Sequence, residues 1–281
     1  MKYLKYKNTL REATFAVALA AISACSGEGS SSTNSDGAST TTGGTGETGV
    51  AGSTARMVIV NDFLYAIADD KIQLFTINTP SMPNPWAKVT VDWDIQTLFP
   101  YNDYLLVGAA DGIHILDNND PANPYLVGDL THARTIDPVV ANEGYAYVTL
   151  KNDPLADNQV DDQMNVVDLA DVTDPKLDKV ISMESPEGLS VVNKRLFVCD
   201  GPAGLKQYNL DDPANPQFVD VIGNVNCNDV IAFGGILYAI TDTSLRQYDY
   251  SMSPPALLSI IETESMSADA LTRALSGKVK I

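Results

Sequence analysis

Four aspartates lie within one short stretch of this sequence, and their carboxylates are hard oxygen ligands of the kind that Ca²⁺ binds. The stretch runs from Lys151 to Asp162 and also contributes the side-chain oxygens of Asn152 and Asn158. The four candidate ligands are Asp153, Asp157, Asp161 and Asp162. Their spacing differs from that of an EF-hand and lacks its central glycine. A Ca²⁺ site and a solvated polar loop therefore both remain open.

A second set of acids recurs along the chain, each at the start of a short apolar run. The set consists of Asp94, Asp137, Glu187 and Asp229. If the apolar runs line a common channel, these acids meet at its mouth, where they could bind a cation or a polar ligand. Ordinary loop acidity is the alternative interpretation.

Two of the three cysteines lie in the second half of the chain, and Cys25 stands apart near the N-terminus. Cys199 ends one predicted strand, and Cys227 begins an inner strand of the next repeat. Antiparallel order brings the end of the one and the start of the other to the same rim. A disulfide and two separate buried thiols both fit, whereas the CxxC spacing of a redox or zinc site is missing from the sequence.

Motifs for catalysis are not found in this sequence. Of its two histidines, His114 lies on an alternating strand, which predicts a polar-face position, and His132 lies in a loop. Neither has the HExxH or HxxxH spacing of a zinc site, and no GxSxG elbow or phosphate-binding loop occurs. We therefore predict no catalytic residues, and a non-catalytic role is favoured.

The elements that must position these residues are set by a repeat. A short apolar block returns five times, and its third residue is Tyr65, Leu106, Tyr147, Phe197 and Tyr238 in turn. Three of the four steps are 41 residues and the third is 50, so nine extra residues fall in the acidic stretch. A regular period of this length is typical of a repeat architecture.

Each repeat has the content of four short strands. In the second repeat, Tyr104–Asp111 is followed by Gly112–Asp117, by the turn Asp120-Pro-Ala-Asn-Pro124 and by Tyr125–Gly128. A further apolar run opens each repeat, as in Leu189–Val192 of the fourth. Asp-Gly is a hairpin signal, and proline cannot continue a strand ladder. Four strands per repeat are the content of a propeller blade. We predict an all-β fold, a β-propeller of five four-stranded blades; ring closure and a six-bladed form stay open.

These repeats resemble the LVIVD repeat family of bacterial surface proteins, which has a β-propeller character. The shared motifs are the Tyr/Leu-rich second strand, the Gly-Leu or Gly-Ile start of the third strand and the Asp-Pro-Ala-Asn-Pro turn. The resemblance covers about residues 55–264 and is clearest in the second and fourth repeats. The third repeat keeps only Thr173-Asp-Pro175, and the fifth has Ser253-Pro-Pro255. The family implies no established catalytic set.

The N-terminus has the pattern of an export signal: basic residues precede an apolar run that is too short to span a bilayer. Ile22-Ser-Ala-Cys25 resembles the lipobox of bacterial lipoproteins, which implies acyl chains on Cys25 and anchoring to a membrane. Position 26 is serine, and by the same resemblance this implies delivery to the outer membrane or cell surface. An ordinary secretory signal with a chance cysteine is the alternative.

The domain organisation follows from these patterns. Residues 1–24 are the predicted lipoprotein signal peptide, and 25–54 comprise the lipidated cysteine with a disordered Gly/Ser/Thr linker. Residues 55–264 are the propeller, and 265–281 form a tail for which a short helix at 268–275 and a closing strand at 278–281 are expected.

The charge excludes one class of partner. Without the four basic residues and one acid of the signal, the chain keeps 14 basic and 35 acidic residues, a net charge of −21. Nucleic-acid binding by counterion release requires the opposite sign. The hypothesis is therefore an exported, lipid-anchored binding or scaffolding module whose partner is an envelope protein or a glycan. The alternative is an exported propeller hydrolase or lyase with a metal-assisted site in the central channel. Ca²⁺ is the only cofactor that the sequence suggests.

Overall fold

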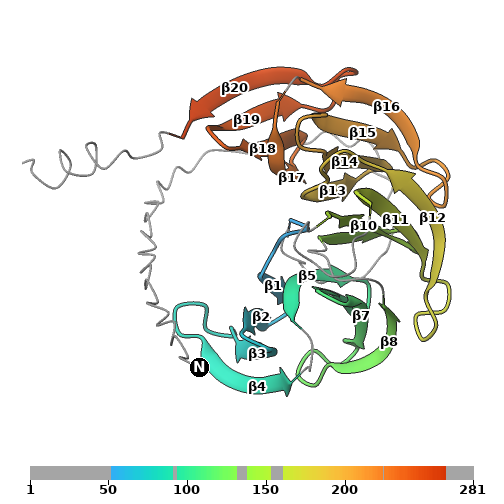
Figure 1. The fold of residues 1–281 in the computed structure, drawn as a ribbon. Helices are drawn as coiled ribbons and strands as arrows, with labels where there is room; N and C mark the ends of the chain where they lie inside the picture. Colours follow the sequence, from blue (N-terminus) through green and yellow to red (C-terminus); the bar gives the residue numbers. More distant parts are fainter. Residues whose placement is uncertain (1–51, 91–93, 132–137, 153–160, 224, 264–281) are drawn as a thin grey trace, which may run out of the picture. The chain divides into compact units, whose positions relative to one another are not determined.

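The computed structural model describes residues 52–90, 94–131, 138–152, 161–223 and 225–263. All of them belong to one compact unit, Thr45–Ile281. The regular elements in these ranges are β-strands, which form five four-stranded antiparallel sheets arranged as the blades of a β-propeller (Figure 1). The predicted fold class and blade number are thereby confirmed. Within the same ranges, no helix has the length and apolar character that a membrane span requires.

Each blade is built from four consecutive strands, the first nearest the axis and the fourth at the outer edge (Figure 1). Blade 1 contains β1 (Met57–Val60), β2 (Phe63–Ala68), β3 (Lys71–Thr76) and β4 (Asn84–Thr90). Blade 2 contains β5 (Ile95–Tyr101), β6 (Tyr104–Ala109), β7 (Gly112–Asp117) and β8 (Tyr125–Thr131). Blade 3 contains β9 (Val139–Asn142), β10 (Tyr145–Leu150), β11 (Gln163–Asp168) and β12 (Lys176–Ser182).

The last two blades follow the same order. Blade 4 contains β13 (Leu189–Val192), β14 (Arg195–Cys199), β15 (Leu205–Asn209) and β16 (Gln217–Ile222). Blade 5 contains β17 (Cys227–Phe233), β18 (Ile236–Thr241), β19 (Ser244–Asp249) and β20 (Ala256–Glu262). In blades 2, 3 and 4, nearly every residue of the second strand is buried, because both faces of these strands are covered.

The turns before the outer strands are stabilised by their own side chains. Asp120 accepts a hydrogen bond from the Ala122 amide through Oδ1 (3.1 Å), and its carbonyl accepts one from the Asn123 amide (2.9 Å). Asp212 and Ala214 repeat the first contact in blade 4, at 3.2 Å. Aspartate at the first turn position bonds the backbone in this way, and the following proline ends the ladder.

Four hydrophobic cores lie between neighbouring blades. Blades 1 and 2, 2 and 3, 3 and 4, and 4 and 5 share one core each. Each core pairs the third residue of one repeat block with the second residue of the next. The pairs are Tyr65 with Leu105, Leu106 with Ala146, Tyr147 with Leu196, and Phe197 with Leu237. All eight residues are fully buried. Among the described residues, no such core joins blade 5 with blade 1.

The two tyrosines among these core residues, Tyr65 and Tyr147, also form polar contacts with the following blade. The Tyr65 hydroxyl shares its one proton between the Pro121 carbonyl (2.7 Å) and Asn118 Oδ1 (2.8 Å). The Tyr147 hydroxyl donates to the Pro213 carbonyl (2.8 Å). Burial raises the pKa of Tyr65 to about 12. The tyrosine of one blade thus holds the proline turn of the next.

Candidate functional site

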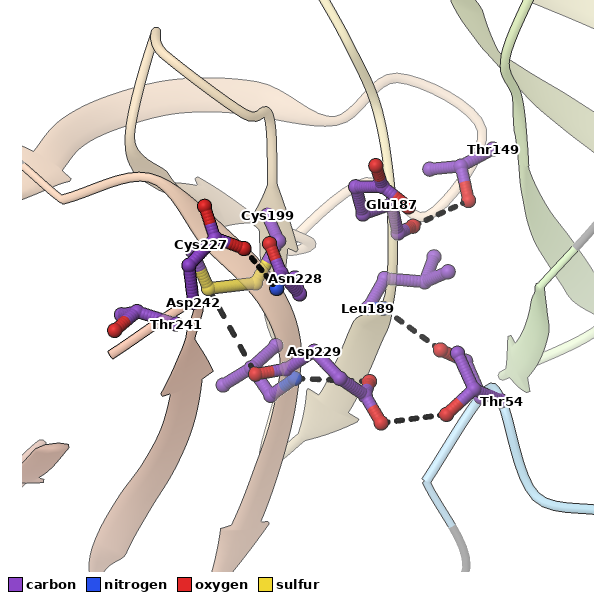
Figure 2. Close-up of a disulfide and its surroundings, with 12 residues drawn as sticks. Thr54, Thr149, Glu187, Leu189, Cys199, Cys227, Asn228, Asp229, Thr241 and Asp242 are labelled. Atoms are coloured by element: carbon purple, nitrogen blue, oxygen red, sulfur yellow. Dashed lines mark hydrogen bonds between the residues drawn. A yellow bond between two sulfur atoms is a disulfide. The ribbon is translucent and has the colours of Figure 1, made fainter. Parts of the chain in front are cut away.

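The mouth of the propeller is the end at which the inner strands begin. There, the segment that precedes β1 lies close to the inner strands of blades 4 and 5 (Figure 2). The Leu189 amide donates to Ser53 Oγ (2.7 Å), and Ser53 is fully buried. The Thr54 hydroxyl donates to Asp229 Oδ2 (2.5 Å). Residues 52–54, which the sequence assigns to the end of the linker, therefore pack on the propeller.

The same segment is also held by blade 2. The Leu98 amide donates to the Ala55 carbonyl (2.8 Å). A single short segment thus contacts the second, fourth and fifth blades at the mouth. Sequence reasoning missed Ser53 and Thr54, because a serine and a threonine in a Gly/Ser/Thr-rich stretch carry no distinguishing signal.

Asp229 is an acid of the predicted channel set that burial largely shields from solvent. Burial raises the pKa of its carboxyl above the ordinary value, and hydrogen bonds from Thr54 and the Val230 amide oppose that shift. Gly188 makes room for it, since a Cβ there would lie 2.0 Å from Asp229 Oδ1. The side chain is therefore fixed against blade 4.

Glu187 lies in a different environment at the same mouth. Its carboxylate forms an ion pair with Lys151, and its carbonyl accepts a hydrogen bond from the Thr149 hydroxyl (2.7 Å). Both partners come from the end of β10 and the loop after it. The loop that carries the nine-residue insertion is thereby tied to blade 4.

A hollow of about 570 Å³ lies on the blade 1 and blade 2 side of the mouth. It is lined by Thr54, Arg56, Asp69, Asp94, Ile95, Gln96, Thr97 and Pro138. The lining combines one guanidinium, two carboxylates, hydroxyls and a side-chain amide. Such a mixture provides hydrogen bonds to a polar ligand, such as a hydroxyl-bearing or amide-bearing molecule.

Gln96 is placed in this hollow by a β-bulge. The register between β5 and β6 shifts between Ile95 and Thr97, so Gln96 is the extra residue. A bulge turns a side chain away from the regular alternation and is common beside functional sites. Gln96 Oε1 is buried and has no hydrogen-bond partner among the described residues. A buried acceptor without a donor is costly, and a ligand that donates a hydrogen bond would relieve that cost.

A disulfide joins Cys199 to Cys227, with their Cα atoms 5.0 Å apart (Figure 2). It links the end of β14 to the start of β17, the two positions that the sequence places on one rim. Beside it, Asn228 Nδ2 donates to Asp242 Oδ1 (2.8 Å). The disulfide therefore connects blades 4 and 5 directly at the mouth.

A buried carboxylate that sequence reasoning missed supports this rim. Asp200 is fully buried and accepts hydrogen bonds from the amides of Glu184 and Ser185 (2.8 Å each). It also forms an ion pair with Lys206. Asp200 thus fixes the segment that leads to Glu187. The only available signal was an aspartate followed by glycine at a strand end, which equally describes an ordinary turn.

The candidate Ca²⁺ ligands are only partly described. Asp153 and Asp157 lie outside the described residues. Asp161 is exposed, and Asp162 Oδ1 accepts a hydrogen bond from the Asn152 amide (2.6 Å), which closes the base of the loop. In the ranges that the structure describes, no three acidic, histidine or cysteine side chains form a group able to hold a metal.

The remaining candidates are placed as follows. Asp94 lines the hollow, whereas Glu187 and Asp229 are each engaged by a different partner. Asp137, Cys25 and the tail 265–281 lie outside the described residues. The polar-face position predicted for His114 is wrong: its side chain is 2% exposed, and Nε2 lies 3.0 Å from Asp111 Oδ1. Neighbouring blades cover both faces of β7, which the alternation of its residues does not reveal.

The chain matches no protein-family model and no curated protein sequence. Among solved structures, it is similar to apo AztD from Citrobacter koseri, with a TM-score of 0.54 at 13% identity. That match covers 73% of this chain and 60% of AztD, so this chain spans less than two thirds of that protein's length.

Two further solved structures show the same likeness. A protein from Lactobacillus plantarum has a TM-score of 0.57 at 10% identity, and the match covers 72% of this chain and 73% of that one. A chain of the Nidogen/Laminin complex has a TM-score of 0.51 at 15% identity, with 75% and 78% covered. At these identities the likeness establishes the propeller fold alone.

Proposed function

We propose that this protein is a lipid-anchored protein of the cell envelope whose propeller serves as a binding module for a protein or glycan partner. The observation that carries the binding role is the polar hollow at the mouth, into which a bulge directs Gln96. Its buried carbonyl oxygen has no donor among the described residues. A polar lining held on rigid blade ends, with one buried acceptor left unpaired, suits a binding site.

Several features support the envelope part of the proposal. The lipobox-like segment ending at Cys25 and the resemblance of the repeats to the LVIVD family both support an exported surface protein. The Cys199–Cys227 disulfide is of a kind that persists in oxidising compartments. The Nidogen/Laminin complex, one of the similar structures, is by its name an assembly of proteins. A protein partner is consistent with that example.

Binding to a glycan array and to an extract of envelope proteins tests this function, with the mature chain and its Gln96→Leu variant as probes. The variant loses the acceptor in the hollow, so we expect retained ligand to fall about tenfold. Asn142→Leu is the matched control, because Asn142 Nδ2 is also buried without a partner but lies at the far end of β9. Equal retention by all three proteins would contradict the assignment of the hollow as the binding site.

A further inference from the structure

The two terminal blades each have one face that no described blade covers. Along the repeat, the third residue of each block enters the core shared with the following blade, and the second residue enters the core shared with the preceding one. Tyr238 is the third residue of the fifth block, so its core would be shared with a following blade. Leu64 is the second residue of the first block, so its core would be shared with a preceding blade. Both are only half-buried, whereas their equivalents in the four cores are fully buried. Figure 1 shows β1–β4 and β17–β20 at the two ends of the series of blades.

Both uncovered faces are apolar. On blade 1, Met57 and Ile59 pair with Ala66 and Leu64 and share their face, and they are 64% and 40% exposed. On blade 5, alternation places Phe233 and Ile240 on the face of Tyr238, at 57% and 49% exposed. Exposed apolar side chains that share one face of a sheet can form an interaction surface.

Tyr238 has the chemistry of a contact between blades. At the equivalent positions, the hydroxyls of Tyr65 and Tyr147 donate to proline carbonyls in the turn of the following blade. Tyr238 carries the same hydroxyl at the same place in its repeat, but no described blade follows it. Blade 1 has a turn of the matching type, Thr79-Pro-Ser-Met-Pro-Asn-Pro85, before its outer strand.

The charges on the two faces also differ in sign. Pairing across the sheet places Lys71 and Lys88 on the uncovered face of blade 1, opposite Ala68 and Gln73. Asp249, which pairs with Ile236, lies on the uncovered face of blade 5. Lys71 is paired with Asp70 (2.7 Å), and Asp249 pairs with Ile236 at the end of blade 5 away from the mouth, so the match between the two faces rests on their apolar character.

We infer that blade 5 of one protomer packs against blade 1 of its partner, so that a second copy of this chain covers both faces. Each copy carries both surfaces, the uncovered face of blade 5 and the uncovered face of blade 1. Within the chain, the same two types of blade face meet in the four cores. A two-fold axis forms the contact twice and leaves neither face exposed. The blade 1 face borders the hollow at Arg56 and Asp69, but the inference does not rest on the proposed binding function.

Sedimentation equilibrium of the mature chain tests the inference, with Cys25→Ser present so that acyl chains do not drive association. We expect a dimer. Met57→Glu and Phe233→Glu each place a charge on one face at a highly exposed position, so neither should impair folding, and each should weaken self-association roughly 100-fold. Phe218→Glu is the matched control: Phe218 is also 57% exposed, but it lies on the outer strand β16, and this variant should remain dimeric.

Mixing the two variants distinguishes this contact from any other dimer. The Met57→Glu copy keeps an intact blade 5 and the Phe233→Glu copy an intact blade 1, so an equimolar mixture should form a heterodimer. Failure to pair, or a monomeric parent chain, would overturn the inference. Hydrogen exchange tests one alternative occupant, the chain's own tail. If the protein is a monomer and the β18 amides are protected, and if this protection is lost when residues 264–281 are removed, the tail covers the blade 5 face and the inference is overturned.

Discussion

Glu187 and Asp229 show how two acids at one mouth acquire different properties. Glu187 is balanced by the Lys151 ammonium, whereas the hydrogen-bond donors to Asp229 are the neutral Thr54 hydroxyl and Val230 amide. Burial without a cation disfavours the charged form of a carboxyl group. Asp229 is therefore the acid in this set whose ionisation should affect the stability of the fold most clearly.

The Asp229→Asn variant tests this environment. The folded-state pKa is raised above the unfolded value, so the stability that the protonated carboxyl provides is complete at low pH and is lost as pH rises through the folded pKa. Asparagine keeps an acceptor for Thr54 and does not ionise. In urea unfolding, we expect the variant to be more stable than the parent at pH 7, and the difference to shrink at pH 3.

Asp249→Asn is the control with the opposite sign. Hydrogen bonds from Ser251 lower the pKa of this exposed carboxyl, so its contribution is present at neutral pH and is lost as pH falls. Its asparagine variant should therefore be the less stable protein at pH 7 and approach the parent in acid. A pH-independent difference for Asp229→Asn would show that its carboxyl is not desolvated.

At the scale of the element, contacts between blades do more than fill volume. The Cys199–Cys227 disulfide joins the end of one blade's second strand to the start of the next blade's inner strand. Tyr65 and Tyr147 add hydrogen bonds from a core position to the turn of the following blade. These devices fix the angle between neighbours, which apolar packing alone specifies less strictly.

Tyr147→Phe measures the contribution of one such device. The change removes only the hydroxyl and leaves the Pro213 carbonyl without this donor, so we expect a loss of about 1 kcal/mol in the free energy of unfolding. Chemical denaturation provides the value. Tyr125→Phe, at a 59% exposed position on the outer strand β8, is the matched control and should change stability little. Equal effects of the two changes would argue against a contact between blades at Tyr147.

At the scale of the whole molecule, the proposed function divides the chain into an anchor and a displayed binding module. The lipid attachment proposed at Cys25 concerns the part outside the described residues, whereas the hollow and the uncovered faces belong to the propeller. The uncovered faces give the module a second property, self-association. Dimerisation would also bring two anchors together, and two acylated chains hold to a membrane far more firmly than one.

The anchor is tested by Cys25→Ala in cells that export the protein. Thiol acylation at this position should be abolished, so we expect no incorporation of labelled palmitate and a shift of the protein from the membrane fraction to the soluble fraction. Cys199→Ala with Cys227→Ala is the control, because it removes the other two cysteines and should leave labelling intact. A membrane-bound, labelled Cys25→Ala protein would contradict the lipoprotein assignment.

The sequence by itself determined the period, the four-strand content of each repeat and the turn chemistry, because these depend on residues close together in the chain. It also limited the cysteine pairing to Cys199 and Cys227, but left open whether they are bonded. Only the tertiary structure decided that Ser53 and Thr54 pack on blades 4 and 5, that His114 is buried, and that Gln96 faces a hollow. It also decided that no described blade covers Tyr238, whereas its four equivalents are covered by the following blade. These features depend on which blades and segments lie next to each other around the axis. That arrangement is set by contacts between residues far apart in the chain.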